Sequence, residues 1–156
     1  MLSIQNVLRF IRFWPPYWAA GIRVAEFSSD ITRIKVSMRL SRRNTNYVGT
    51  HFGGNLYSMC DPWYMFIVME HLGRDFIVWD KAAEIEFVSP GKGTVSAEFV
   101  ISPQELAELR AQLQEQRKVL PVFQTEVVDE RGRTVARIRK TLYVKRKASH
   151  RESDHA

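Results

Sequence analysis

The sequence predicts an α+β fold in which a curved antiparallel β-sheet wraps around a long central helix. Residues 55–72 are apolar on nearly every side of a helix, which indicates a helix that is buried all round. Most of the remaining chain consists of short segments in which apolar and polar residues alternate, the period of a half-buried strand. One sheet covers only one side of a helix, so we expect a second copy of the chain to cover the other side.

The first element is a short amphipathic helix over residues 3–13, followed by a proline-rich link that reaches residue 18. The helix is expected to end at Pro15 and Pro16 and to pack on the domain or on a partner subunit. A membrane-surface role is the alternative, because arginines alternate with aromatic residues here. The helix is predicted from apolar residues spaced three, four and seven apart: Ile4, Val7, Leu8 and Ile11.

A hairpin is predicted next, with strands over residues 21–27 and 33–40. The second strand alternates strictly, with Ile34 and Val36 on one side and Arg33 and Lys35 on the other. The cluster Ser28-Ser29-Asp30 is typical of a turn. Residues 41–54 are expected to form a loop, and the central helix of residues 55–72 is expected to end at Gly73.

Four further strands are predicted after the central helix. Ser102 and Glu105 form a capping box with a proline at the first helical position, which predicts a surface helix that runs to about residue 117. The polar tail of residues 148–156 is expected to be disordered, which leaves a single domain over residues 19–147. The strands are expected over residues 76–88, 94–101, 119–128 and 134–145.

Composition limits the classes of function. The single cysteine, Cys60, excludes an internal disulfide and favours a reducing, cytoplasmic compartment. The histidines have no metal-ligand spacing, so no metal is expected, and no segment is apolar enough to span a membrane. The net charge of +6 is concentrated over residues 137–147, which indicates either a solvated strand edge or a phosphate-bearing ligand. No nucleic-acid-binding motif accompanies this charge, so nucleic acid is not an expected partner.

Residues 46–62 carry the densest set of reactive groups in the chain. A helix that begins at Gly53-Gly54 presents unpaired backbone N–H groups to a carbonyl or phosphate. Asp61 follows about two turns later and can reach the same ligand atom, so the segment predicts a small hydrolytic site. The structural alternative for Asp61 is a helix N-cap with Pro62 at the first helical position. His51 and Asn46 have structural alternatives too, as a core histidine and as a turn former.

The same segment resembles the hotdog fold, a resemblance that covers residues 20–147. Asn46, Gly53, Gly54 and Asp61 stand at the spacings of the phenylacetate-pathway type of hotdog thioesterase. One departure is that Phe52 stands where that type has its histidine, and His51 comes one residue early. The runs of residues 49–54, 58–62 and 78–83 are most similar to the hotdog family described as tetrameric acyl-CoA thioesterases.

The resemblance implies that the chain hydrolyses acyl-CoA thioesters as a cytoplasmic homodimer or homotetramer, with coenzyme A as part of the substrate and no separate cofactor. It implies that Asp61 is the base or nucleophile and that Gly54 supplies the backbone donor for the oxyanion. Asn46 and His51 complete the expected catalytic set. The expected substrate-binding residues are Gly53, Phe52 and Met65 near the acyl group, and Arg42, Arg43, Lys92, Arg139 and Lys140 near the phosphates.

Two alternatives remain open from the sequence. A non-catalytic protein of the same fold would bind acyl-CoA or an acyl chain without turnover, which the displaced histidine and the Asp-Pro pair favour. A hydratase or dehydratase of acyl thioesters would need a histidine placed beside the carboxylate, and only His51 is near in sequence.

Overall fold

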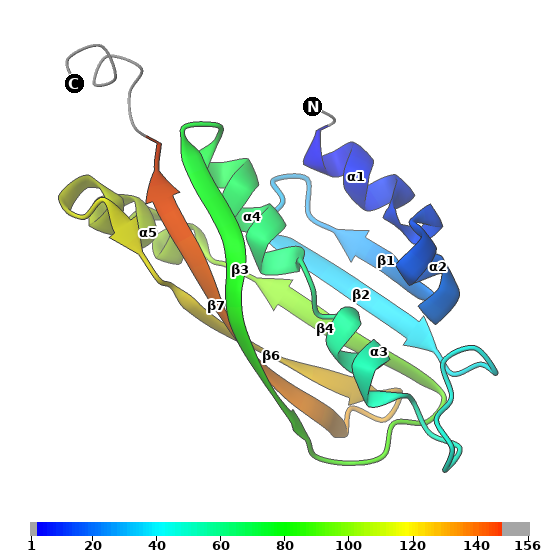
Figure 1. Ribbon diagram of the computed structural model, residues 1–156. Helices are drawn as coiled ribbons and strands as arrows, with labels where there is room; N and C mark the ends of the chain where they lie inside the picture. Colours follow the sequence, from blue (N-terminus) through cyan, green and yellow to red (C-terminus); the bar gives the residue numbers. More distant parts are fainter. Residues whose placement is uncertain (1–2, 148–156) are drawn as a thin grey trace, which may run out of the picture.

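A computed structural model describes residues 3–147, and the tail that we expected to be disordered lies outside these residues. One antiparallel sheet of seven strands has the order β1-β2-β4-β6-β7-β3, and the short β5 pairs with β7 (Figure 1). The predicted α+β architecture is confirmed. The strands are β1 (Ile22–Phe27), β2 (Arg33–Arg39), β3 (Phe76–Phe87), β4 (Thr94–Val100), β5 (Lys118–Val119), β6 (Val122–Asp129) and β7 (Thr134–Arg146).

The central helix is broken, which corrects the prediction of one helix over residues 55–72. It consists of α3 (Gly53–Ser58) and α4 (Trp63–Leu72). Pro62 has no N–H to donate to the Ser58 carbonyl, and a proline disfavours the helical conformation in the residue before it. Asp61 therefore lies in the break. Its side chain makes no capping bond to α4, so the N-cap hypothesis is also wrong.

Three short helices form the N-terminal segment: α1 (Ile4–Phe10), the 3₁₀ helix η1 (Ile11–Phe13) and α2 (Pro15–Ala20). The sequence predicted the first part and missed α2, in which the prolines occupy the first turn, where a missing N–H costs nothing. Leu8, Ile11 and Tyr17 are buried in the same core as α4. The N-terminal segment therefore covers part of the central helix, a role that the sequence predicts for a second copy of the chain. The domain boundary predicted after residue 18 falls inside α2.

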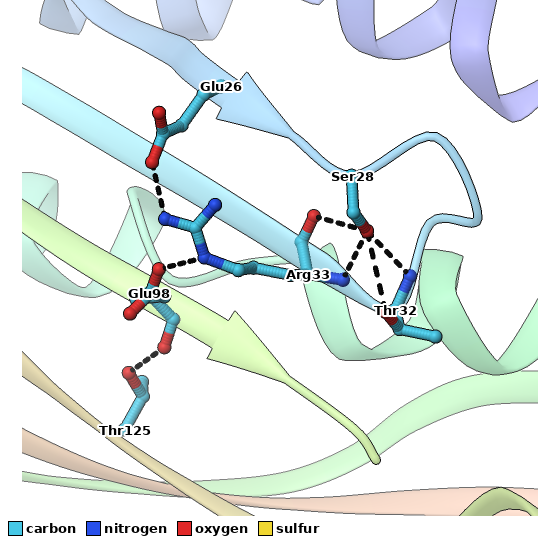
Figure 2. Close-up of polar contacts among 6 residues, drawn as sticks. All are labelled: Glu26, Ser28, Thr32, Arg33, Glu98 and Thr125. Atoms are coloured by element: carbon cyan, nitrogen blue, oxygen red, sulfur yellow. Dashed lines mark hydrogen bonds and ion pairs between the residues drawn. The ribbon is translucent and has the colours of Figure 1, made fainter. Parts of the chain in front are cut away.

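The first hairpin follows its prediction closely. The turn between β1 and β2 is held by the Ser28 hydroxyl, which accepts hydrogen bonds from the backbone N–H groups of Thr32 (3.1 Å) and Arg33 (3.0 Å). On the exposed face, the Arg33 guanidinium lies between the carboxylates of Glu26 on β1 and Glu98 on β4 (Figure 2). These contacts join three neighbouring strands at one end of the sheet.

The second half of the sheet is built around the long pair of β3 and β7. The predicted strand of residues 119–128 is interrupted at Pro121, which separates β5 from β6. The capping box of Ser102 and Glu105 is present and opens α5 (Pro103–Glu115).

No helix among residues 3–147 is long and apolar enough to cross a membrane.

Helix α4 packs its aromatic residues against the sheet. The Tyr64 ring lies edge-on to Phe99 of β4, with 5.2 Å between ring centroids, and stacks on Phe123 of β6 at 4.9 Å. Trp63 and Ile67 are fully buried on the same helix. This packing fixes α4, and therefore the position of the break before it, relative to β4 and β6 of the sheet.

Replacement of Ile67 by alanine is expected to lower the free energy of unfolding by about 2–5 kcal/mol, because the side chain is completely buried and would leave a cavity. Glu70→Ala on the exposed side of the same helix is the matched control, and should change it by less than about 0.5 kcal/mol. Urea denaturation measures both. Equal effects of the two substitutions would contradict the assigned packing of α4.

Candidate functional site

The site is centred on a lysine in the core. The side chain of Lys140 on β7 is 1% exposed. It belongs to the alternating set that faces α4, between Ile138 and Leu142, whereas Arg137 and Arg139 point to the outer face. A buried ammonium is costly unless charged partners surround it.

Two carboxylates supply those partners. The Lys140 ammonium Nζ lies 2.7 Å from Oδ1 of Asp61 and 3.1 Å from Oδ1 of Asp80. The Tyr57 hydroxyl of α3 is 3.5 Å from the same nitrogen, and the ammonium lies 5.3 Å from the centre of the Tyr57 ring. We call Lys140, Asp61, Asp80 and Tyr57 the Lys140 cluster.

Irregular backbone places both carboxylates. Asp61 lies in the break between α3 and α4, and its backbone carbonyl accepts a hydrogen bond from the Tyr17 hydroxyl of α2. Asp80 lies on β3 immediately before a register shift at Lys81, which interrupts the pairing with β7. A bulge of this kind redirects neighbouring side chains and is common beside functional sites. The helix break and β3 thus each place a carboxylate beside Lys140, and the N-terminal segment holds the backbone of Asp61 through Tyr17.

The two carboxylates differ in their affinity for protons. Burial acts to raise the pKa of Asp61, but its hydrogen bonds with Asp80 and Lys140 and the lysine charge outweigh burial and lower it below the usual 3.8. Burial and the hydrogen bond with Asp61 raise the pKa of Asp80 to about 6, against the attraction of Lys140. For Lys140, burial is outweighed by the two carboxylates, which raise its pKa. The cluster therefore holds one firmly ionised carboxylate and one that titrates near neutrality.

Asp61 is the member of the cluster that can meet a ligand. Its side chain is 45% exposed, whereas that of Asp80 is 20% exposed. An ionised carboxylate that is held by a buried lysine and open to solvent on one side can accept a proton from water or attack an electrophilic carbon. Lys140 and Asp80 fix its position and charge.

The Gly53-Gly54 pair begins α3, so the helix starts two residues before the predicted bound at Asn55. In the described residues, neither glycine N–H donates to a protein acceptor, because both lie in the first turn. A side chain at either position would displace an aromatic ring: a Cβ on Gly53 would lie 2.9 Å from the Phe87 ring, and one on Gly54 would lie 2.5 Å from the Phe52 ring. The glycines therefore allow two aromatic rings to approach the start of the helix.

His51 and Asn46 lie in the preceding loop, and the buried Nδ1 of His51 has no hydrogen-bond partner in the described chain. The buried His51 ring has Nε2 3.0 Å from the Gly93 carbonyl, and burial lowers its pKa. The Asn46 side chain accepts from the N–H groups of Val48 and Thr50. Both residues line a depression of about 370 Å³ that also includes Gly53. Neither is among the hydrogen-bond or charge partners of Asp61.

The other predicted binding residues are spread over the surface. Arg42, Arg43 and Lys92 are exposed in loops, and Arg139 faces Glu84 on the outer side of the sheet at 3.4 Å. Lys140 corrects the sequence interpretation, because it is buried between carboxylates and is not available to a phosphate at the surface. Phe52 is exposed beside Gly54, and Met65 lines an apolar groove of about 520 Å³ next to the N-terminal helices.

Sequence reasoning missed Tyr57 and the buried role of Lys140. The signal for Lys140 was its register, because it shares the inward alternation of Ile138 and Leu142. The signal for Asp80 is that it breaks the apolar–polar alternation of its strand. Among residues 3–147, no group of three or more histidine, cysteine, aspartate or glutamate side chains is arranged to hold a metal ion.

Solved structures share this architecture. A probable thioesterase from Pseudomonas aeruginosa has a TM-score of 0.78 and 17% identity, over 92% of this chain and 96% of that chain. A thioesterase from Haemophilus influenzae has a TM-score of 0.68 and 16% identity, over 96% and 95%. The PaaI protein of the Escherichia coli phenylacetic acid degradation operon has a TM-score of 0.58 and 17% identity, over 96% and 98%.

The chain therefore has the hotdog fold, as its sequence predicted. The model of a domain of unknown function, DUF4442, matches residues 5–144, and the chain belongs to this family. No curated protein matches the sequence significantly.

The raised pKa of Asp80 predicts a distinct dependence of stability on pH. Because the folded state binds this proton more tightly than the unfolded state, its contribution is fully present below about pH 4 and is lost as the pH rises through about 6. The lowered pKa of Asp61 has the opposite effect on the free energy of unfolding. Its stabilising contribution is present above the usual pKa of 3.8 and is lost as the pH falls below that value. The difference in unfolding free energy between wild type and Asp80→Asn should therefore change between pH 4 and 6. A constant difference across this range would contradict the assignment.

Proposed function

We propose that this protein hydrolyses acyl-CoA thioesters and that Asp61 is its catalytic carboxylate. The observation that carries the proposal is the position of Asp61: half-exposed in the break of the central helix, and held ionised by a buried lysine. The hotdog fold, which a probable thioesterase from Pseudomonas aeruginosa and a thioesterase from Haemophilus influenzae share, supports the reaction class.

In the proposed reaction Asp61 acts as a general base. Its carboxylate accepts a proton while the water oxygen forms a bond to the thioester carbon, and the carbonyl oxygen becomes an oxyanion. Collapse of this intermediate breaks the carbon–sulfur bond, and the coenzyme A thiolate takes the proton back from Asp61. The lowered pKa keeps Asp61 in the base form at neutral pH.

The start of α3 supplies the proposed oxyanion donor. The N–H groups of Gly53 and Gly54 are without protein acceptors in the described chain, and donors of this kind are worth about 3 kcal/mol of barrier in known enzymes. Phe52 and Met65 stay proposed contacts of the acyl group. Arg42, Arg43, Lys92 and Arg139 stay proposed contacts of the phosphates, and His51 and Asn46 act by holding the loop before Gly53.

We also propose that the active form is a homo-oligomer. β3 forms one edge of the sheet, and over its twelve residues it pairs only with β7 in the described chain. A long free strand edge is a template for pairing with another chain, and pairing with a second β3 would extend the sheet with two-fold symmetry. The cytoplasmic location stays a prediction from cysteine usage.

A non-catalytic acyl-CoA-binding protein is the second candidate. The observation in its favour is that Lys140 already occupies one Asp61 oxygen, while the buried His51 does not reach this carboxylate. Such a protein would keep the site and bind the same ligands without releasing thiol.

Asp61→Asn is expected to lower thiol release from acyl-CoA substrates roughly a hundred- to ten-thousand-fold, the range for loss of a general base. A panel of acyl and aryl thioesters with a thiol reagent measures the rate, and thermal melts confirm folding. Asp75→Asn, an exposed carboxylate on the turn before β3, is the matched control and should keep the wild-type rate. Wild-type protein that binds acyl-CoA in calorimetry but releases no thiol would establish the binding function instead.

Light scattering after size-exclusion chromatography is expected to give a mass of two or four times the 18.2 kDa chain. The reason is the unpaired edge of β3, which a second chain would cover. A mass of a single chain at micromolar concentration, with full thioesterase activity, would contradict the oligomeric proposal and leave the catalytic one intact.

A further inference from the structure

The N-terminal helices expose a cluster of large aromatic side chains. Phe10, Phe13, Trp14 and Trp18 are 64%, 61%, 52% and 60% exposed. Their neighbours Leu8, Ile11 and Tyr17 are buried, so the segment is attached to the core by one face and presents the other to solvent. We call the four exposed residues the aromatic patch. Isolated exposed apolar residues are ordinary, but a group of this size marks an interaction surface.

An apolar groove adjoins the aromatic patch. It has a volume of about 520 Å³ and lies between the N-terminal helices and α4, which Figure 1 shows on the same side of the molecule. Phe10 and Trp14 of the patch form one wall, and Met65 and Phe66 of α4 form the other. The groove extends the apolar surface beyond the four exposed rings.

The charge around the patch is positive. The Arg12 guanidinium lies 4.6 Å from the centre of the Phe13 ring, and that of Arg43 lies 5.0 Å from the Trp18 ring. Arg9 is exposed beside Phe10. Residues 1–25 contain no aspartate or glutamate, and in the described chain none of these three arginines has a carboxylate partner within 4.0 Å. Their charges are therefore free to meet an anionic surface.

We infer that the aromatic patch and its arginines dock the protein on an anionic phospholipid bilayer. Tryptophan and other amphipathic rings are favoured at the level of the lipid headgroups, where the ring is in apolar surroundings and its edge is wet. Arginines beside them are attracted to the phosphates of an anionic leaflet. The short helices lie on the surface and do not span it, which is the geometry of an interfacial segment.

Charge argues against a second copy of this chain as the occupant. A two-fold contact buries the same surface of both copies, and here it would place the arginines of both copies in one interface. With no carboxylate in residues 1–25, the N-terminal segment of either copy supplies nothing to neutralise these arginines. An anionic bilayer matches the charge and also accepts the aromatic rings.

Co-sedimentation with vesicles tests the inference. The full chain is mixed with sucrose-loaded vesicles of phosphatidylcholine and phosphatidylglycerol in equal parts, or of phosphatidylcholine alone, at low and high salt. We expect pelleting with the anionic vesicles that weakens with salt, and much less with the neutral ones. The double variants Phe13→Ser/Trp18→Ser and Arg9→Glu/Arg12→Glu should each lower the partition coefficient at least about tenfold.

Matched controls change the same properties elsewhere on the surface. Leu120→Ser removes an exposed apolar side chain before β6, and Arg131→Glu reverses an exposed charge in the β6–β7 turn. Both should pellet like wild type. Absence of wild-type binding to anionic vesicles overturns the inference, and so does equal binding by the patch and control variants. If sedimentation velocity instead shows self-association that the patch variants abolish, the patch is an interface between copies. Thiol release is not a readout here, so the result is independent of the proposed function.

Discussion

The burial of the Lys140 ammonium is the interaction on which the site depends. The lysine occupies a core position of β7 where its neighbours are aliphatic, and such a position tolerates a charge only if opposite charges come with it. Asp61 and Asp80 meet this requirement from two other elements, at 2.7 and 3.1 Å. These contacts compensate the buried charge of Lys140. They also fix the positions of the two carboxylates and give them different pKa values.

The broken central helix is the second half of this arrangement. A continuous helix would direct residue 61 along a regular face, whereas the break at Pro62 frees Asp61 to turn towards β7. The Tyr17 hydroxyl then holds the Asp61 carbonyl from the N-terminal segment. The helix therefore loses regular backbone bonds at the place where the chain gains a half-exposed, ionised carboxylate.

The two surfaces that we assign to ligands meet at residues 61 and 62. Asp61 turns its side chain towards the sheet, and Pro62 lines the groove beside the aromatic patch. The N-terminal helices contribute to both, through the Tyr17 hydroxyl, which donates to the backbone carbonyl of Asp61, and through Phe10, which lines the groove. A substrate with a long apolar chain and a phosphate-bearing head is amphipathic, and amphipathic molecules concentrate at lipid surfaces. The proposed thioester hydrolysis and the proposed membrane docking are therefore compatible, although each has its own test.

The sequence by itself determined the fold class, the first hairpin and the capping box of α5, and it singled out Asp61 as the candidate carboxylate. These features depend on local periodicity, on short-range capping and on one recognisable motif, all of which residues close in sequence specify. Only the tertiary structure decided that the helix breaks at Pro62, that α2 forms, and that Lys140 is a buried partner of Asp61 and Asp80. For Lys140 the reason is that the cost of burying its charge is met by carboxylates 79 and 60 positions away in the chain, which no local pattern specifies. The break and α2 both depend on prolines, and a proline is compatible either with the end of a helix or with its first turn.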